Sequence, residues 1–238
     1  MKLEYIPQID AKMYLRDHTD LWGWYQNNEY EPHETELVKK IVKKDWVCID
    51  VGANIGYYSI LMAKLGAQVH SWEAEQSNYG MLFDNFAINN LRGVKLWPPA
   101  IVTDHTNPQE KLYLCNKSHG MHRAFPSKHC DGYVYCRAVM IDDYELEPDF
   151  IKIDVEGSEF QVLNGMRKTI YRDKPIMLIE FHPPTLQEAG TNGYLIYAML
   201  KDMGYKITLV HPYTEIKSYE QLYHLTNNES GGQNILCQ

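Results

Sequence analysis

The chain has 238 residues, 45% of them hydrophobic, and a formal net charge of −8 at pH 7. This apolar fraction suits one well-buried domain over 1–238, and no run approaches the ~18 apolar residues of a membrane span. The first ten residues also lack the apolar core of a signal peptide, so we expect a soluble, cytoplasmic protein. An acidic balance without a long Lys/Arg run disfavours nucleic acid as a partner.

The cysteines are the first residues whose number and spacing limit the class of protein. They are odd in number and irregularly spaced, unlike the disulfide framework of small secreted proteins. The paired C-x-x-C spacing typical of structural zinc sites is also absent. We therefore predict free thiols at all five positions: Cys48, Cys115, Cys130, Cys136 and Cys237.

Strands and helices are predicted to alternate along the chain. Residues 1–44 comprise an N-terminal extension without clear periodicity and a helix that begins at Pro32 and ends near residue 44. The catalytic core follows over 45–238. Alternation of this kind predicts a doubly wound α/β fold, with helices on both faces of a mostly parallel sheet. The predicted strands are 46–51, 67–72, 94–102, 150–155, 175–181 and 205–210, with 233–237 as a last strand at or near the sheet edge; the helices are 55–65, 76–91, 158–171 and 192–203.

An insertion at about 108–140 interrupts the alternation between the third and fourth core strands. Residues 111–115 and 133–139 alternate like an antiparallel hairpin, and a polar loop over 116–131 joins them. Loops of that length are more often functional than neutral, so we expect a lid that orders over an acceptor substrate. Its candidate hydroxyl donors or bases are His119, His122 and Arg123.

The turn after the first core strand is the expected cofactor site. Ligands of open α/β sheets bind beyond the carboxyl ends of the strands, and glycines in this turn permit a close backbone approach. A nicotinamide-binding loop would need further glycines where Asn54 and Tyr57 stand, so the dehydrogenase pattern is absent. We predict that S-adenosylmethionine binds here, in contact with Asp50, Gly52, Asn54, Gly56 and Tyr57.

A second acid, Glu73, ends the next predicted strand, 21 residues after Gly52. At this spacing a carboxylate can accept hydrogen bonds from both hydroxyls of a ribose. Glu73 is therefore the predicted ribose ligand.

Three stretches together resemble the FkbM-type methyltransferases. They are DVGANIGYYS at 50–59, Glu73 with NFAINN at 85–90, and IKIDVEGSE at 151–159. The resemblance covers about 45–182 and implies a class I, Rossmann-like methyltransferase fold that uses S-adenosylmethionine. It also implies methyl transfer to a hydroxyl oxygen, commonly of a sugar or polyketide-like natural product. Ala74 stands where the family often has an acid-proline pair, and the hairpin insertion is particular to this chain.

Acidic residues mark the ends of the fourth and fifth core strands. Asp154 and Glu156 follow one strand, and Glu180 and His182 end the next, so parallel pairing places them at the cofactor cleft. Methyl transfer to an alcohol requires removal of its proton. One route uses Mg²⁺ or another divalent cation held by Asp154, Glu180 and Glu156; the other uses an acid or His182 directly, and Asp154 is required in both. Structural alternatives are helix capping by Asp154 or Glu156, and pairing of Glu180 with Lys152.

The sequence therefore predicts an S-adenosylmethionine-dependent O-methyltransferase whose acceptor is a sugar, a glycan or a similar small molecule. One alternative is methylation of RNA or protein, which the acidic balance and the lack of an N-P-P-Y-like motif disfavour. The other is an inactive methyltransferase fold that serves as a binding module. Retention of the whole cofactor turn together with Asp154 argues against that alternative.

Overall fold

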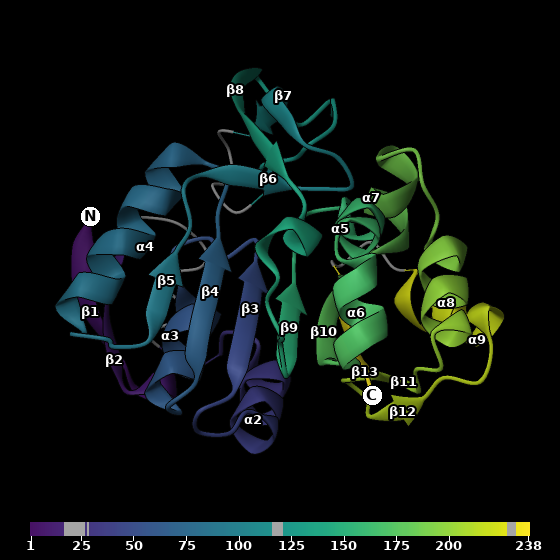
Figure 1. Cartoon of the computed structure of the whole chain (residues 1–238), viewed down its shortest axis with the longest axis horizontal. Helices are drawn as coiled ribbons and strands as arrows, with labels where there is room; N and C mark the ends of the chain where they lie inside the picture. Colours follow the sequence, from purple (N-terminus) through teal and green to yellow (C-terminus); the bar gives the residue numbers. More distant parts are fainter. Residues whose placement is uncertain (17–26, 28, 116–120, 228–231) are drawn as a thin grey trace.

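An eight-stranded sheet forms the centre of the computed structural model, which describes residues 1–16, 27, 29–115, 121–227 and 232–238 (Figure 1). In spatial order the strands are β12 (Thr214–Glu215), β11 (Ile207–Leu209), β13 (Gln233–Cys237), β10 (Ile176–Phe181), β9 (Phe150–Ile153), β3 (Val47–Val51), β4 (Gln68–Trp72) and β5 (Val94–Leu96). From β10 to β5 all neighbours pair in parallel, which confirms the predicted doubly wound, mostly parallel sheet. The last strand, β13, inserts antiparallel between β10 and β11, third from the edge.

Two apolar cores lie on opposite faces of this sheet because successive side chains of a strand point to opposite sides. Ile49 and Val51 of β3 belong to one core, and Cys48 belongs to the other. The core of Cys48 is covered by α2 (Pro32–Ile41), α3 (Tyr57–Lys64) and α4 (Gln76–Ile88). The core of Ile49 is covered by α5 (Glu159–Gly165), α6 (Arg167–Asp173), α7 (Pro183–Glu188), α8 (Gly193–Asp202) and α9 (Tyr219–Thr226).

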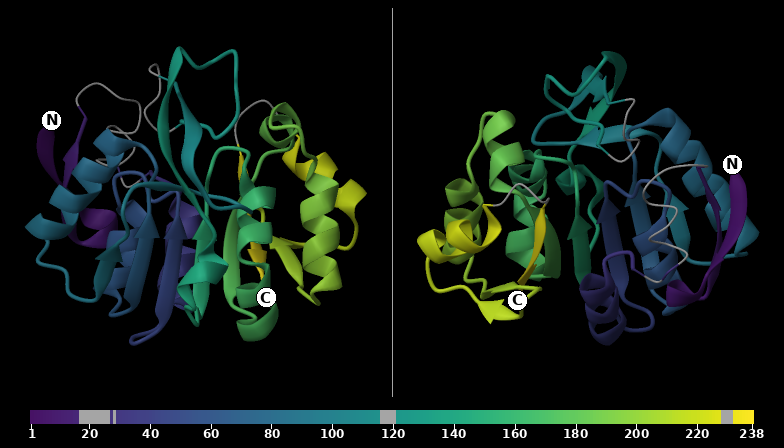
Figure 2. Two further views of the ribbon diagram at one scale, coloured as in Figure 1. Left: turned by 45° about the horizontal axis from the view of Figure 1, so that its top comes forward. Right: turned by 180° about the vertical axis from the view of Figure 1, so that it is seen from behind.

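The N-terminal stretch contains a hairpin that the sequence analysis did not predict. Strands β1 (Lys2–Ile6) and β2 (Ala11–Leu15) pair antiparallel around a short 3-10 helix, η1 (Pro7–Ile9). The alternating residues Ala11, Met13 and Leu15 are buried in the core beneath α3 and α4. This hairpin lies beside α4 (Figures 1 and 2), so packing against a distant helix decided its structure.

The predicted third strand, 94–102, is two strands in the structure. Pro98 and Pro99 separate β5 from β6 (Ala100–Val102), because proline cannot donate a ladder hydrogen bond. With β7 (Asn107–Leu114) and β8 (Gly132–Val139), β6 forms a separate sheet in the order β6-β8-β7. The antiparallel β7–β8 pair confirms the predicted hairpin, which projects beyond the arrowheads of β3, β4 and β9 (Figure 1).

Two further differences concern the second half of the chain and the cysteines. The predicted helix over 158–171 is divided at Met166 into α5 and α6, where a side chain on Gly165 would collide with the carbonyl oxygen of Thr103. Free thiols were wrongly predicted at two positions, because the ends of β7 and β8 bring Cys115 and Cys130 together as a disulfide. The other three cysteines carry free thiols as predicted.

Among the described helices, none has the length and apolar character of a membrane span.

Candidate active site

The turn from β3 to α3 has room only for glycine at its two key positions. Gly52 has φ +81°, and a Cβ atom there would lie 1.8 Å from the carbonyl oxygen of Asp154. Gly56 has φ +99°, and its Cβ would lie 2.4 Å from Leu82 Cδ1. Glycine adopts left-handed backbone conformations more readily than residues with a Cβ atom. The predicted cofactor turn therefore packs directly against the residue that follows β9.

Glu73 lies at the carboxyl end of β4, beside the cofactor turn. Its two carboxylate oxygens accept hydrogen bonds from the backbone N–H groups of Asn54 and Glu75, each at 2.8 Å. Burial raises the pKa of Glu73 to about 7. Each carboxylate oxygen has a second lone pair, so Glu73 is fixed in orientation and still able to accept ligand hydroxyls.

Asp50 and Tyr57, both predicted to contact the cofactor, are directed into the protein interior. Asp50 is 1% exposed and accepts a hydrogen bond from Ser59 Oγ at 2.5 Å. The Tyr57 hydroxyl lies 3.1 Å from Thr35 Oγ1, between α2 and α3. These contacts fix α3 to β3 and α2, so both residues stabilise the framework of the turn.

Three predicted carboxylates come together at the ends of β9 and β10. Asp154, Glu156 and Glu180 each place one carboxylate oxygen within 4.8 Å of the other two. Burial, followed by the charge of Asp154, raises the pKa of Glu156 to about 8 and that of Glu180 well above its ordinary value. Oxygen donors at this spacing could hold a divalent cation; otherwise, protons reduce their mutual repulsion.

Lys152 balances part of this negative charge. Its ammonium donates to Asp154 Oδ2 at 2.7 Å, which shows that the alternative pairing with Glu180 was wrong. Burial disfavours the ammonium, but the carboxylates of Asp154 and Glu31 still hold the pKa of Lys152 above its ordinary value. The Tyr58 ring lies 4.7 Å from this ammonium, and its hydroxyl donates to Glu31 Oε2 at 2.5 Å. Segments far apart in sequence thus meet beside Asp154.

The turn between β9 and α5 has its own internal acceptor. Glu159 Oε1 accepts the backbone N–H groups of Val155 and Gly157 at 3.3 and 3.1 Å. Glu159 thus satisfies the turn that precedes α5. The first turn of α5 shows no hydrogen bond to the carboxylate of Asp154 or Glu156 among the described residues, so the capping alternative for those two acids was wrong. Their carboxylates remain available for a substrate, a proton or a cation.

His182 and the insertion border the same turn. His182 precedes α7, and its Nδ1 lies 2.5 Å from Thr185 Oγ1. A Cβ atom on Gly157 would lie 2.8 Å from Thr185 Cγ2 and 3.0 Å from Phe125 Cε1. The insertion therefore reaches the acid-bearing turn through Phe125.

Arg123 attaches the insertion to α7. It is 4% exposed, and its Nη1 donates to Glu188 Oε2 at 2.5 Å and to Ser127 Oγ at 3.1 Å. Nδ1 of His122 accepts the backbone N–H of Cys115 at 3.2 Å. The third predicted lid residue, His119, lies outside the described residues. In the described part of the loop, the Arg123 side chain therefore attaches the insertion to α7.

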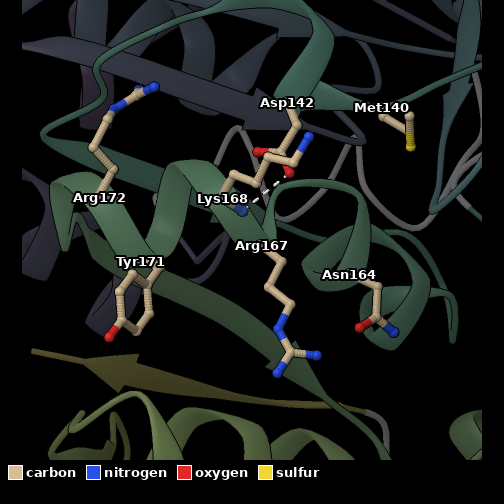
Figure 3. Close-up of a pocket in the computed structure, with 7 residues that line it drawn as sticks. All are labelled: Met140, Asp142, Asn164, Arg167, Lys168, Tyr171 and Arg172. Carbon is tan, nitrogen blue, oxygen red and sulfur yellow. Dashed lines mark hydrogen bonds between the residues drawn. The ribbon is translucent and has the colours of Figure 1, made fainter.

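A separate cavity of about 560 Å³ is lined by residues of α5, of α6 and of the segment that follows β8 (Figure 3). In Figure 3 Asp142 faces the start of α6, where its carboxylate accepts the Lys168 backbone N–H at 3.0 Å. The Arg172 guanidinium bonds its neighbour Asp173, so this arginine is already neutralised. The cavity is lined by Met140, Asp142, Asn164, Arg167, Lys168, Tyr171 and Arg172, none of which the sequence analysis selected.

Comparison with known families identifies the class of protein. Residues 50–207, more than half of the chain, match the family described as "Methyltransferase FkbM domain". The chain belongs to this family. It is a methyltransferase of the S-adenosylmethionine-dependent kind, as the sequence motifs predicted. No curated protein sequence matches the chain significantly.

Solved structures agree on the fold. The chain superposes on a precorrin-6y C5,15-methyltransferase from Geobacter metallireducens with a TM-score of 0.51 and 14% identity, covering 94% of this chain and 93% of that one. An FkbM methyltransferase from Methylobacillus flagellatus superposes with a TM-score of 0.50 and 17% identity, covering 91% of this chain and 52% of that one. This chain thus spans about half the length of that methyltransferase. A Pyrococcus abyssi tRNA (uracil-54, C5)-methyltransferase in complex with S-adenosyl-L-homocysteine superposes with a TM-score of 0.50 and 13% identity, covering 99% of this chain and 43% of that one. The fold is that of the class I methyltransferases.

Several residues beside the site were not selected from the sequence as site residues, and Lys152 was considered only as a partner of Glu180. Lys152 carried a usable signal, because a lysine within the apolar run of β9 must be paired when buried. Arg16, Glu31 and Asn78 carried none, since each reaches the site through contacts between distant segments.

Proposed function

We propose that this methyltransferase transfers the methyl group of S-adenosylmethionine to a hydroxyl oxygen of a sugar, a glycan or a similar small molecule. The observation that supports it is the position of Asp154, whose backbone adjoins Gly52 of the cofactor turn and whose carboxylate is oriented by Lys152. Attack on a sulfonium carbon is an in-line displacement, so it requires an aligned hydroxyl and a nearby proton acceptor. The net charge of −8 favours an uncharged acceptor over RNA.

The cofactor would lie across the carboxyl ends of β3 and β4. In this proposal Gly52, Asn54 and Gly56 face the ligand with their backbone, while Glu73 accepts both ribose hydroxyls. Asp50 and Tyr57 act on the cofactor through the framework of the turn. Because both Glu73 oxygens are already fixed by backbone donors, ribose binding requires no side-chain rearrangement.

The acceptor hydroxyl would lie between Asp154 and the insertion, where Asp154 accepts the proton. The Lys152 ammonium holds this carboxylate in place at 2.7 Å. His182 is the alternative acceptor, with its ring fixed by Thr185. Phe125 supplies an apolar wall, and the nearby Arg123 attaches this part of the insertion to Glu188 of α7. Arg123 thus acts on the acceptor through Phe125, and His122 and His119 are the remaining polar candidates of the lid.

A divalent cation is the second route to the same chemistry. Asp154, Glu156 and Glu180 would hold it, and a bound Mg²⁺ would lower the pKa of the acceptor hydroxyl. The burial and mutual repulsion of these acids support the proposal, because an added positive charge would relieve both. Binding should then release protons, since Glu156, whose pKa is raised to about 8, would ionise.

Methyl transfer from labelled S-adenosylmethionine to a panel of glycosides and small-molecule alcohols tests the proposal. We expect labelled ether products, and the same assay with chelator and then Mg²⁺ separates the two routes. Activity that survives chelation excludes the cation. Labelling of RNA or protein in place of alcohols would overturn the acceptor class. Cofactor binding without turnover on any acceptor would favour an inactive binding module.

A further inference from the structure

The N-terminal hairpin is hydrogen-bonded to the helix that follows Glu73. Asn85 of α4 is fully buried, and its Oδ1 accepts the backbone N–H of Tyr14 in β2 at 2.6 Å. The Nδ2 of the same amide donates to the carbonyl oxygen of Ile55 in the cofactor turn at 2.8 Å. One side chain thus connects β2, α4 and the cofactor turn, although the matched family segment begins only at residue 50.

Arg16, directly after β2, extends this connection to the start of α4. Its Nη1 donates to Asn78 Oδ1 at 2.6 Å, and its Nη2 donates to Ser77 Oγ at 2.5 Å. The carboxylates of Glu75 and Glu73 attract the guanidinium electrostatically. Arg16 is therefore held where it adds positive charge beside the proposed ribose ligand.

Asn78 carries the influence of Arg16 to Glu73. Asn78 is 2% exposed, and its side chain favours the ionised form of the nearby Glu73 carboxyl group. An amide has one acceptor oxygen and one donor nitrogen. Arg16 donates to the oxygen, and a favourable interaction with a carboxylate requires a donor, which in Asn78 is the amide nitrogen. Arg16 thereby favours the amide orientation that directs this donor toward Glu73.

We propose that Arg16 is a positioning residue of the cofactor site, and that the N-terminal hairpin supports this site structurally. Glu73 must be ionised to accept two ribose hydroxyls, but its burial favours the neutral acid. The Asn78 amide and the charge of Arg16 both favour the ionised carboxylate. This inference rests on the proposed ribose contact of Glu73; it does not depend on the identity of the acceptor.

Calorimetry with S-adenosylhomocysteine and its 2′,3′-dideoxyribose analogue tests the inference. We expect Arg16→Ala to weaken binding of the product by about tenfold and to leave the analogue unaffected, because loss of one charged hydrogen bond has that magnitude. Arg16→Lys keeps the charge and should recover part of the affinity. Lys12→Ala is the matched control on the same hairpin, since Lys12 contacts Asn89 of α4 through its backbone.

A second variant distinguishes positioning from general destabilisation. Asn78→Asp still accepts from Arg16 but places a second carboxylate against Glu73, so it should lose the preference for the ribose hydroxyls. Arg16→Ala and Glu73→Gln should be non-additive in a double-mutant cycle. Equal losses for both ligands, additive effects, or unchanged affinity in Arg16→Ala would each overturn the inference. Wild-type protein that binds neither ligand would instead overturn the proposed cofactor site.

Discussion

The proposed cofactor side and the proposed acceptor side of the site are built in different ways. On the proposed cofactor side, the groups expected to face the ligand come from one short stretch, the five-residue turn from Gly52 to Gly56 and Glu73, which backbone N–H groups fix. The N-terminal hairpin supports this stretch through Asn85 and Asn78. On the proposed acceptor side, contacts between distant segments form the wall itself, as Arg123 bonds Glu188 and Phe125 lies against Gly157. Local backbone geometry can be encoded by a short motif, whereas long-range contacts depend on the whole fold. The difference explains why the family motifs identify the cofactor and leave the acceptor open.

The largest expected effect comes from the cofactor turn. Gly52→Ala should abolish binding of S-adenosylhomocysteine, because the added Cβ collides with the Asp154 carbonyl and the backbone lies at φ +81°. Calorimetry and thermal unfolding measure both consequences. Gly80→Ala is the matched control: it lies within α4 with nothing within 4 Å of its Cβ, and it should stabilise the protein by up to about 1 kcal/mol. Normal binding by Gly52→Ala would show that the turn does not contact the cofactor.

Asp154→Asn should have the next largest effect, now on the acceptor side. Removal of a general base costs about 10²- to 10⁴-fold in rate. Binding of S-adenosylhomocysteine should stay unchanged, because the substitution preserves shape and leaves the Gly52 contact with the Asp154 backbone in place. Single-turnover kinetics on an acceptor from the panel measure the loss, with Asp84→Asn on the exposed face of α4 as the control. Wild-type turnover would remove Asp154 from the mechanism.

Arg123→Met tests whether the insertion acts on the acceptor alone, because the substitution detaches the insertion from α7. The substitution keeps much of the buried stem but breaks the pair with Glu188, a loss of about 1.5 to 3 kcal/mol for a charged hydrogen bond. We expect a higher KM for the acceptor and an unchanged Kd for the cofactor. Glu188→Gln should reproduce the effect more weakly, since an amide oxygen can still accept. An equal loss of cofactor affinity would contradict the separation of the two sides.

The smallest effect is a pH dependence of stability in the unliganded protein. Burial raises the pKa of Glu73 and of Glu159 to about 7, from the ordinary value of 4.5. Between these values the folded state binds protons that the unfolded state has released, so stability falls as the pH rises through this window. Thermal unfolding from about pH 5 to about pH 8 should show a falling Tm. Glu73→Gln should reduce the slope; a rising Tm would contradict the burial of these acids.

Sequence periodicity was sufficient for most of the central sheet. β3, β4, β9 and β10 are short apolar runs followed by helices, and each lies within two residues of its predicted bounds. Prediction failed where tertiary contacts decided the outcome. The hairpin of β1 and β2 is ordered by burial of Met13 and Leu15 against α3 and α4, which local pattern does not reveal.

The sequence by itself determined the family, the cofactor and the acids Asp154, Glu156 and Glu180, because turn chemistry and parallel strand order place such residues at one edge. Only the tertiary structure decided which group each of them meets. It paired Lys152 with Asp154, placed Asp50 in the interior and brought Arg16 to Asn78. The physical reason is range: backbone geometry is set within a few residues, whereas burial and charge pairing depend on segments that only folding brings together.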